Sequence, residues 1–249
     1  GQTANIALNA GVHLVVNPFI SQGVQRNWAL DNCPFKHDWI LFLDADEEST
    51  PAFAAALGKA IETAAPEVAG YYCCCKMMLY DRWLKRSDNF PIWQFRLLRL
   101  GRARYIDFGH AEKEGDLDGE AAYLKEPYMH YAFRSGWRWW IHRHNHYSEL
   151  EAKERYSYPV KLAELLSPHR SIRNKAVKPL VSRIPGWPLL HFLHQYVFSL
   201  GFLDGPEGFI HCVNKSYYEY LIQLKMKDLQ HEATVPQAEK PSSLSNVNS

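Results

Sequence analysis

Hydrophobic and polar positions along the first third of the chain alternate in blocks that predict helices and strands in turn. Five consecutive apolar residues at 39–43 are too few for a buried helix and predict a strand buried on both faces. Thr50 and Pro51 then predict the cap and first residue of a helix. In full, the pattern predicts helices at 3–9, 24–30 and 51–63, and strands at 14–16, 39–43 and 70–78. This alternation predicts an α/β fold with a mostly parallel sheet flanked by helices.

The remainder of the chain changes character twice. Short runs and turn residues between positions 79 and 131 predict an antiparallel extension of the sheet. From Ser135 onward the pattern becomes helical and aromatic, and the last residues, rich in Pro, Ser and Asn, predict a disordered tail. We therefore expect an α/β domain at 1–133, a carboxyl-terminal helical extension at 134–230 and a tail at 231–249.

Composition narrows the class of protein. With 249 residues, 47% hydrophobic and 22% charged, the chain is typical of a globular protein, and its net charge of +1 gives no signal for nucleic-acid binding. Cys73, Cys74 and Cys75 are consecutive, and neighbours on a strand point to opposite faces, so we expect reduced thiols in a cytoplasmic protein. No run of about 18 apolar residues predicts a spanning helix.

Two carboxylates follow the predicted strand at 39–43. Asp44 and Asp46 stand one residue apart in the sequence D-A-D-E, at the carboxyl end of the strand, where ligands bind in open α/β sheets. Their oxygens suit a hard divalent cation and the phosphates that it carries. The alternative is a solvated acidic turn that caps the next helix.

Several motifs together resemble one enzyme family. They are Gln25-Arg26-Asn27, Asp38-Trp39, L-F-L-D-A-D-E from Leu41, His130-Tyr131, H-N-H-Y-S-E-L-E-A from His144 and L-G-F-L-D-G from Leu200. In this combination the chain resembles family-2 glycosyltransferases of bacterial lipopolysaccharide and exopolysaccharide synthesis, including the lipooligosaccharide β-1,4-glucosyltransferase type. No single motif would suffice.

The resemblance implies a GT-A (Rossmann-like) domain that transfers a sugar with inversion. The expected donor is a nucleotide diphosphate sugar, UDP-hexose first, and the expected acceptor is a lipopolysaccharide or exopolysaccharide saccharide. Such enzymes open with a strand, helix and strand that end in a motif like D-S-x-S-T-D-x-T, whereas this sequence starts at Gly1-Gln2-Thr3. We therefore expect an amino-terminally truncated fragment that lacks this first strand-helix-strand, and truncation could remove activity.

The resemblance also assigns roles around the donor. Mg²⁺ or Mn²⁺ would bind Asp46 directly, with Asp44 on the ribose or on the metal through water. His130 matches a position for a late metal or pyrophosphate contact, although an ordinary half-buried histidine remains the alternative. Arg26, with Gln25 beside it, would face the phosphates, and Asn27 would bond the sugar or ribose.

An inverting transfer needs a base for the acceptor hydroxyl. The segment Gly109 to Glu114 occupies the place where the family shows a His-Glu type motif, but Ala111 separates the histidine from the first glutamate. Glu112 is the first candidate for the base and Glu114 the second, and His110 would orient either of them or the acceptor. A solvated charged loop is the alternative for all three.

A membrane surface is the further partner that the sequence predicts. No acidic residue lies between Ser167 and Leu203, where Arg170, Arg173, Lys175, Lys178 and Arg183 precede a stretch with Trp187 and Phe192. Basic residues followed by an aromatic helix are typical of an interfacial anchor on anionic lipid. We expect a peripheral protein at the inner face of the cytoplasmic membrane. The alternative is a helix packed on the α/β domain.

Two other functions compete with sugar transfer. A phosphatase of the haloacid-dehalogenase type also uses D-x-D after a strand, but it prefers Thr or Val two residues beyond the second aspartate, where Glu48 stands here. A non-catalytic remnant could keep the fold and bind saccharide or membrane without turnover. The sequence favours the transferase.

Overall fold

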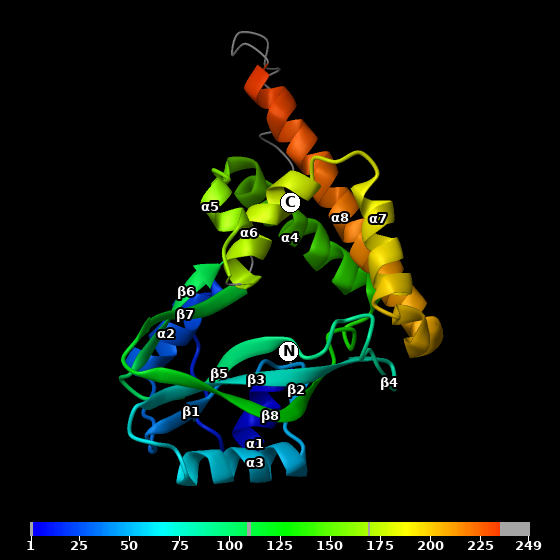
Figure 1. Ribbon diagram of the computed structural model, residues 1–249. Helices are drawn as coiled ribbons and strands as arrows, with labels where there is room; N and C mark the ends of the chain where they lie inside the picture. The colour runs from blue at the N-terminus through cyan, green and yellow to red at the C-terminus, as the bar shows by residue number, and fades with distance from the viewer. Residues whose placement is uncertain (1, 109–110, 169, 235–249) are drawn as a thin grey trace. The chain divides into compact units, whose positions relative to one another are not determined.

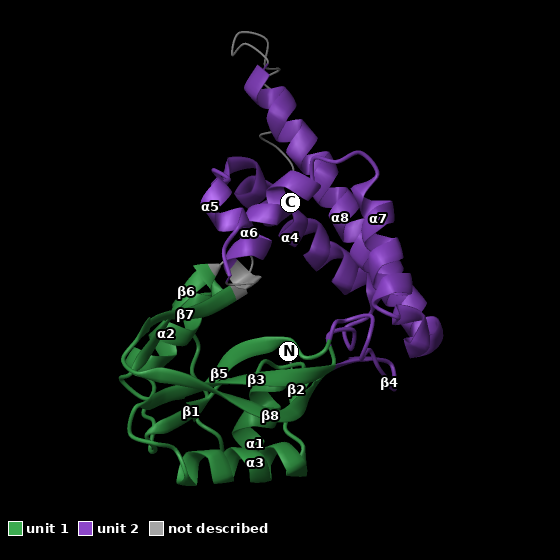
Figure 2. Ribbon diagram, in the orientation of Figure 1, with its two compact units in different colours: residues 1–76, 90–131 green, residues 77–89, 132–249 purple. Residues whose placement is uncertain are grey.

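The computed structural model describes residues 2–108, 111–168 and 170–234, which form a mixed α/β protein that ends in a long helix (Figure 1). The chain divides into two compact units (Figure 2). Unit 1 comprises residues 1–76 and 90–131, and unit 2 comprises residues 77–89 and 132–249. The segment 77–89, which we had placed in the α/β domain, therefore belongs to the helical unit.

The main sheet has six strands among the described residues, in the order β1-β5-β3-β8-β2, with β4 pairing with the end of β3. These strands are β1 (Trp39–Leu41), β2 (Glu47–Glu48), β3 (Val68–Leu79), β4 (Arg82–Trp83), β5 (Trp93–Arg99) and β8 (Glu120–His130). A separate two-stranded sheet joins β6 (Ala103–Phe108) to β7 (Ala111–Leu117). The predicted antiparallel strands between 79 and 131 are thus present.

The main sheet is not the mostly parallel one that we predicted. β1 and β3 both pair antiparallel with β5, and β2 pairs antiparallel with β8. The alternation of helices and strands does set β1 and β3 in the same direction, as predicted. However, β5 inserts between them from later in the chain, and periodicity within one segment cannot reveal such an insertion.

Two of the three described helices of unit 1 begin at side-chain caps that the sequence provides. The three helices are α1 (Thr3–Asn9), α2 (Gln22–Asn32) and α3 (Pro51–Glu62), so all three predicted helices are confirmed. The Ser21 side chain accepts a hydrogen bond from the Val24 N–H, and the Thr50 side chain accepts one from the Phe53 N–H. Each cap satisfies a backbone donor that the first helical turn leaves unpaired.

The predicted strand at 14–16 is wrong. These residues have no strand pairing in the described structure, and the side chains of Leu14 and Val16 are 41% and 85% exposed. Branched apolar residues favour a strand only where a neighbouring strand and a core layer receive them. A short apolar run alone is therefore insufficient to predict one.

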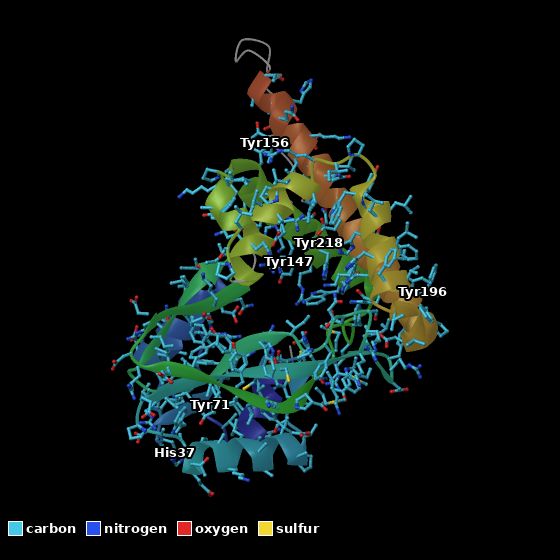
Figure 3. All side chains as sticks on the ribbon, in the orientation of Figure 1. His37, Tyr71, Tyr147, Tyr156, Tyr196 and Tyr218 are labelled. Carbon is cyan, nitrogen blue, oxygen red and sulfur yellow. The ribbon has the colours of Figure 1, made fainter. Side chains whose placement is uncertain are left out.

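Helix α3 covers an apolar cluster on the sheet of unit 1. Phe53 meets Tyr128 edge to face, with ring centroids 5.5 Å apart. Tyr71, labelled in Figure 3, belongs to the same cluster and donates its hydroxyl to the Ala60 carbonyl. Cys73 is fully buried in this cluster as a free thiol, as predicted, and its burial raises its pKa to about 12.

The described residues of unit 2 between 137 and 234 are mainly helical, as predicted. Its helices are α4 (Trp137–Ser157), α5 (Leu162–Leu165), α6 (Arg170–Val181), α7 (Trp187–Leu193), the π-helix η1 (His194–Phe198), the 3₁₀-helix η2 (Gly201–Asp204) and α8 (Gly205–Thr234). Helix α8 includes the first residues of the predicted tail, and 235–249 lie outside the described residues. Within the described ranges, no helix is long and apolar enough to cross a bilayer.

A buried arginine joins the helices of unit 2. Arg155 on α4 forms hydrogen bonds of 2.7 and 3.0 Å with the Glu219 carboxylate on α8 and one of 2.8 Å with the Ser182 hydroxyl. Trp187 donates its indole N–H to the same glutamate at 3.0 Å. A buried charge of this kind is stable only when it is paired, so these contacts fix the helices relative to one another within the unit.

Asp204 attaches the 77–89 segment to the helices of unit 2. One oxygen of its carboxylate accepts hydrogen bonds from the backbone N–H groups of Arg86 and Ser87, at 2.8 and 2.7 Å, and from the Ser87 hydroxyl at 2.8 Å. Gln195 of η1 donates to the Ser87 carbonyl from the other side. The L-G-F-L-D-G motif that ends in Asp204 and Gly205 is therefore a structural attachment point.

Replacing Asp204 with Ala should lower the stability of the protein by about 2–4 kcal/mol, because two buried donors and one partly buried donor lose their acceptor together. Thermal and urea unfolding followed by circular dichroism would measure this. Asp81→Ala is the matched control, since it removes an exposed carboxylate from the same segment and should change stability by less than about 0.5 kcal/mol. Equal effects of the two changes would contradict the attachment role.

Candidate functional site

The D-A-D-E turn after β1 is closed by its own hydrogen bonds. The Glu47 N–H donates to the Asp44 carbonyl at 3.0 Å, and the Asp44 N–H donates to the Glu47 carboxylate at 2.8 Å. At the other side of the turn, the Asp46 carbonyl accepts from the Tyr131 N–H at 2.8 Å. The turn is therefore tied both to itself and to the residue that follows β8.

Two buried arginines engage Asp44. Arg26 of α2 and Arg96 of β5 are 4% and 2% exposed, and each contacts a different oxygen of the carboxylate, at 3.0 and 2.9 Å. The Arg26 guanidinium also lies over the rings of Phe42 and Tyr105, about 5 Å from each centroid. Both oxygens of Asp44 are thus paired with arginine, and the predicted phosphate contact of Arg26 is here a carboxylate contact.

Glu47 is the buried partner of Arg96. Its Oε1 lies 2.7 Å from Arg96 Nη2 and accepts a hydrogen bond of 3.1 Å from the Tyr128 hydroxyl. Burial raises the pKa of Glu47, and Arg96 opposes that shift. Burial alone would lower the pKa of Arg96, but Tyr128, Glu47 and Asp44 raise it. Arg96 and Glu47 thus form a buried ion pair at the end of the D-A-D-E turn.

Glu112, the first candidate base, joins the same cluster from β7. Its Oε1 lies 3.0 Å from Arg26 Nη2 and 3.8 Å from Arg96 Nη1. Glu114 has a different partner, the Tyr72 hydroxyl, and this hydrogen bond together with burial raises the pKa of Tyr72. His110, the third residue of this prediction, lies outside the described residues. The structure therefore brings one of the two glutamates to the D-x-D turn.

Asp46 and His130 form a second pair at this site. The Asp46 Oδ2 lies 3.6 Å from His130 Nε2, and the β2–β8 pairing sets Glu47 opposite His130. Burial alone would lower the pKa of His130, but its interactions with Asp46 and the Cys75 thiol raise it to about 10. These interactions favour the protonated imidazole beside the second aspartate of the motif, so a metal that bound His130 would have to displace that proton.

Asn27 and Gln25 have backbone and local partners. The Asn27 amide donates to the Tyr105 carbonyl at 2.8 Å and accepts from the Tyr105 N–H at 2.9 Å. Gln25 accepts from the Asn17 amide at 2.9 Å. Asn27 therefore fixes α2 to β6 and positions Arg26, and its contact with the sugar or ribose stays a prediction.

The side chains at this site supply some of the ligands that a divalent cation needs. Asp44 could bind a metal only by giving up an arginine, because both of its oxygens are paired. Asp46 and His130 offer a carboxylate, which suits Mg²⁺ or Mn²⁺, and an imidazole, a frequent metal ligand. In the described part of the chain, no three His, Cys, Asp or Glu side chains are grouped to hold a metal by themselves. A cation here would need further ligands from a bound phosphate or water.

Arg96, Glu47 and Tyr128 are site residues that the sequence analysis missed. Arg96 lies within F-R-L-L-R-L from Phe95, one of the short runs between positions 79 and 131 that predict antiparallel strands. An arginine at the centre of an apolar strand is rarely buried unless it is paired, so it could have indicated an ionic site. Nothing local identifies Glu47 as its partner, because the two are joined only by the fold.

The chain was also compared with models of known protein families, and no family model matches it.

Replacing Arg96 with Met should destabilise the protein by about 3–5 kcal/mol, because Glu47 would be left buried without a cation. Adding Glu47→Gln to that variant should recover part of the loss, since the uncompensated charge is gone. Chemical unfolding would measure both. A buried carboxylate without a partner takes up a proton more readily in the folded state, so the deficit of the single variant should shrink as the pH falls.

Arg104→Met is the control, because Arg104 pairs with Asp31 at the surface and such pairs contribute at most about 1 kcal/mol. If the double variant is as unstable as Arg96→Met, the buried charge of Glu47 is not the cause of the loss.

Proposed function

We propose that the protein is an inverting glycosyltransferase that moves a sugar from a nucleotide diphosphate donor, UDP-hexose first, to a lipopolysaccharide or exopolysaccharide acceptor. One observation carries the proposal: Arg26 contacts both Asp44 of the D-x-D turn and Glu112, each at 3.0 Å. The carboxylate turn and the candidate base, which the resemblance assigns to one reaction, thus meet at a single guanidinium nitrogen, Arg26 Nη2.

The charge balance supports a cation and a diphosphate as ligands. Arg26 and Arg96 face three carboxylates, those of Asp44, Glu47 and Glu112, which leaves one carboxylate in excess. Such a cluster attracts a divalent cation first, and the cation then attracts a diphosphate. Negative charge grows on the departing diphosphate during transfer, so cations held in place beforehand lower the barrier.

Asp46 and His130 are the residues that would hold the cation in this proposal. A bound Mg²⁺ or Mn²⁺ supplies Lewis-acid stabilisation of the leaving diphosphate. The chain itself holds Asp46 in place through the backbone hydrogen bond between the Asp46 carbonyl and the Tyr131 N–H. Asp44 then serves as the anchor that aligns Arg26 and Arg96, and its contact with the donor is secondary.

Glu112 is the residue that would take the proton of the acceptor hydroxyl. Its carboxylate is held by Arg26 on one oxygen and has only partial exposure, 14% of the side chain. An oriented carboxylate can accept a proton as the new bond to the anomeric carbon forms. Glu114, which bonds Tyr72, is the second candidate.

The phosphatase alternative loses support at Asp44. In that chemistry the first aspartate of D-x-D attacks phosphorus and needs an unencumbered oxygen. Here both Asp44 oxygens lie within 3.0 Å of a guanidinium nitrogen. A non-catalytic saccharide-binding protein remains the second candidate, and measured turnover separates it from the transferase.

Asp46→Ala should abolish binding of UDP that depends on Mn²⁺ while leaving the fold intact, because it removes a ligand at the end of a turn and no core volume. Isothermal titration with UDP, with and without Mn²⁺, measures this. Glu48→Ala is the control, since it removes the exposed neighbouring carboxylate. Unchanged affinity in Asp46→Ala would reject the metal assignment.

Glu112→Gln keeps the size of the side chain but removes the proton acceptor, so turnover should fall about 10²-fold or more with donor affinity little changed. Steady-state transfer assays across several UDP-hexoses, with Glu114→Gln in parallel, measure it. A loss confined to Glu114→Gln would move the base to that residue. If neither variant loses turnover, the base is another residue.

A further inference from the structure

Helix α8 turns a line of large apolar side chains outward. We define the outer stripe as Phe209, Val213, Tyr217, Tyr220 and Leu224, whose exposures are 48, 41, 43, 48 and 38%. Their spacing of four, four, three and four residues places them along one face of the helix. An exposed apolar surface of this extent is a frequent mark of a membrane or partner contact.

The opposite face of α8 carries polar groups into the interior of unit 2. His211 is 3% exposed and lies 3.3 Å from Asp88, while Glu219 pairs with Arg155. His211 is therefore an interior side chain of unit 2, and its burial lowers its pKa. The inner face also buries Ile222 and Met226, at 0 and 5% exposure, in an apolar cluster with Ala152. The outer stripe is therefore a second apolar face, additional to the one that α8 already packs into unit 2.

Helix α7 and η1 extend this surface. Their outward side chains are Leu189, Leu190, Leu193, Val197 and Phe198, which are between 40 and 77% exposed. α7 packs beside α8 (Figure 1), and Phe209 of the stripe contacts Phe192 and Tyr196, the latter labelled in Figure 3. The two helices thus form one hairpin whose outward apolar residues adjoin.

A groove with only basic charge borders the hairpin. It has a volume of about 890 Å³, and Leu189 of α7 and Tyr220 of the stripe both line it. Arg183 and Lys227 also line it, and no acidic residue is among the described lining residues. Positive charge beside an apolar, aromatic surface is complementary to anionic lipid headgroups above acyl chains.

We propose that the outer stripe and the outward residues of α7 and η1 lie in the interface of an anionic lipid bilayer, parallel to its plane, with Arg183 and Lys227 among the headgroups. This inference is independent of the proposed sugar transfer. It changes the anchor expected from the sequence, because Trp187 bonds Glu219 and Phe192 stacks on Tyr196 instead of projecting outward.

Co-sedimentation with vesicles of equal parts phosphatidylglycerol and phosphatidylcholine tests the proposal. The triple change Val213→Gln, Tyr217→Gln and Leu224→Gln should lower the partition coefficient at least about tenfold, because it removes the apolar contact. The double change Arg183→Gln with Lys227→Gln should lower the partition coefficient about fivefold for each charge removed. Replacing the anionic lipid with phosphatidylcholine, or raising the salt concentration, should also lower the partition coefficient of the unchanged protein.

The matched control is Ile141→Gln, Leu162→Gln and Leu166→Gln, which removes three apolar side chains of 44, 73 and 77% exposure outside the stripe and should leave binding unchanged. Circular dichroism checks that each variant folds, and the lipid and salt series on the unchanged protein does not depend on any variant. Equal binding by both triple variants would overturn the proposal. Wild-type binding that does not depend on lipid charge or salt would also overturn it. So would a finding that the stripe variant converts a dimer to a monomer without any change in vesicle binding, because the stripe would then contact a second copy of the chain.

Discussion

The pairing of two buried guanidinium groups with three carboxylates is the interaction on which the architecture of unit 1 depends. An arginine cannot shed its proton in a protein, so burying Arg26 and Arg96 requires anions at fixed positions around them. Those anions come from the turn after β1 and from β7, and the arginines come from α2 and β5. Four elements that are distant in sequence must therefore meet within a few ångströms before the charges are satisfied.

The local part of the fold could be predicted because its causes are local. Ser21 and Thr50 cap the helices that follow them, and the apolar run at Trp39 becomes β1. The neighbours of each strand could not be predicted in the same way. β5 lies between β1 and β3, and nothing in the periodicity of those two segments shows that a later strand will separate them.

In the candidate site, too, individual residues could be predicted from the sequence but their partners could not. The D-x-D turn could be selected from the sequence because it follows an apolar strand, and Arg26, Glu112 and His130 could be selected from the resemblance to family motifs. Their partners could not be selected. Asn27 forms hydrogen bonds with the Tyr105 backbone, and Arg96 pairs with Glu47 through contacts that only the tertiary structure creates. Side-chain type predicts what a group can bind, and the fold decides which of those options it uses.

The membership of segment 77–89 in unit 2 constrains how the protein can be divided. The chain passes from one unit to the other after residues 76, 89 and 131, so no single cut separates them. A gene shortened at residue 131 would encode unit 1 with a piece of unit 2 attached, and the complementary fragment would lack the partners of Asp204. Recombination that exchanges one unit for another domain is therefore restricted, because the coding segments of the two units are interleaved.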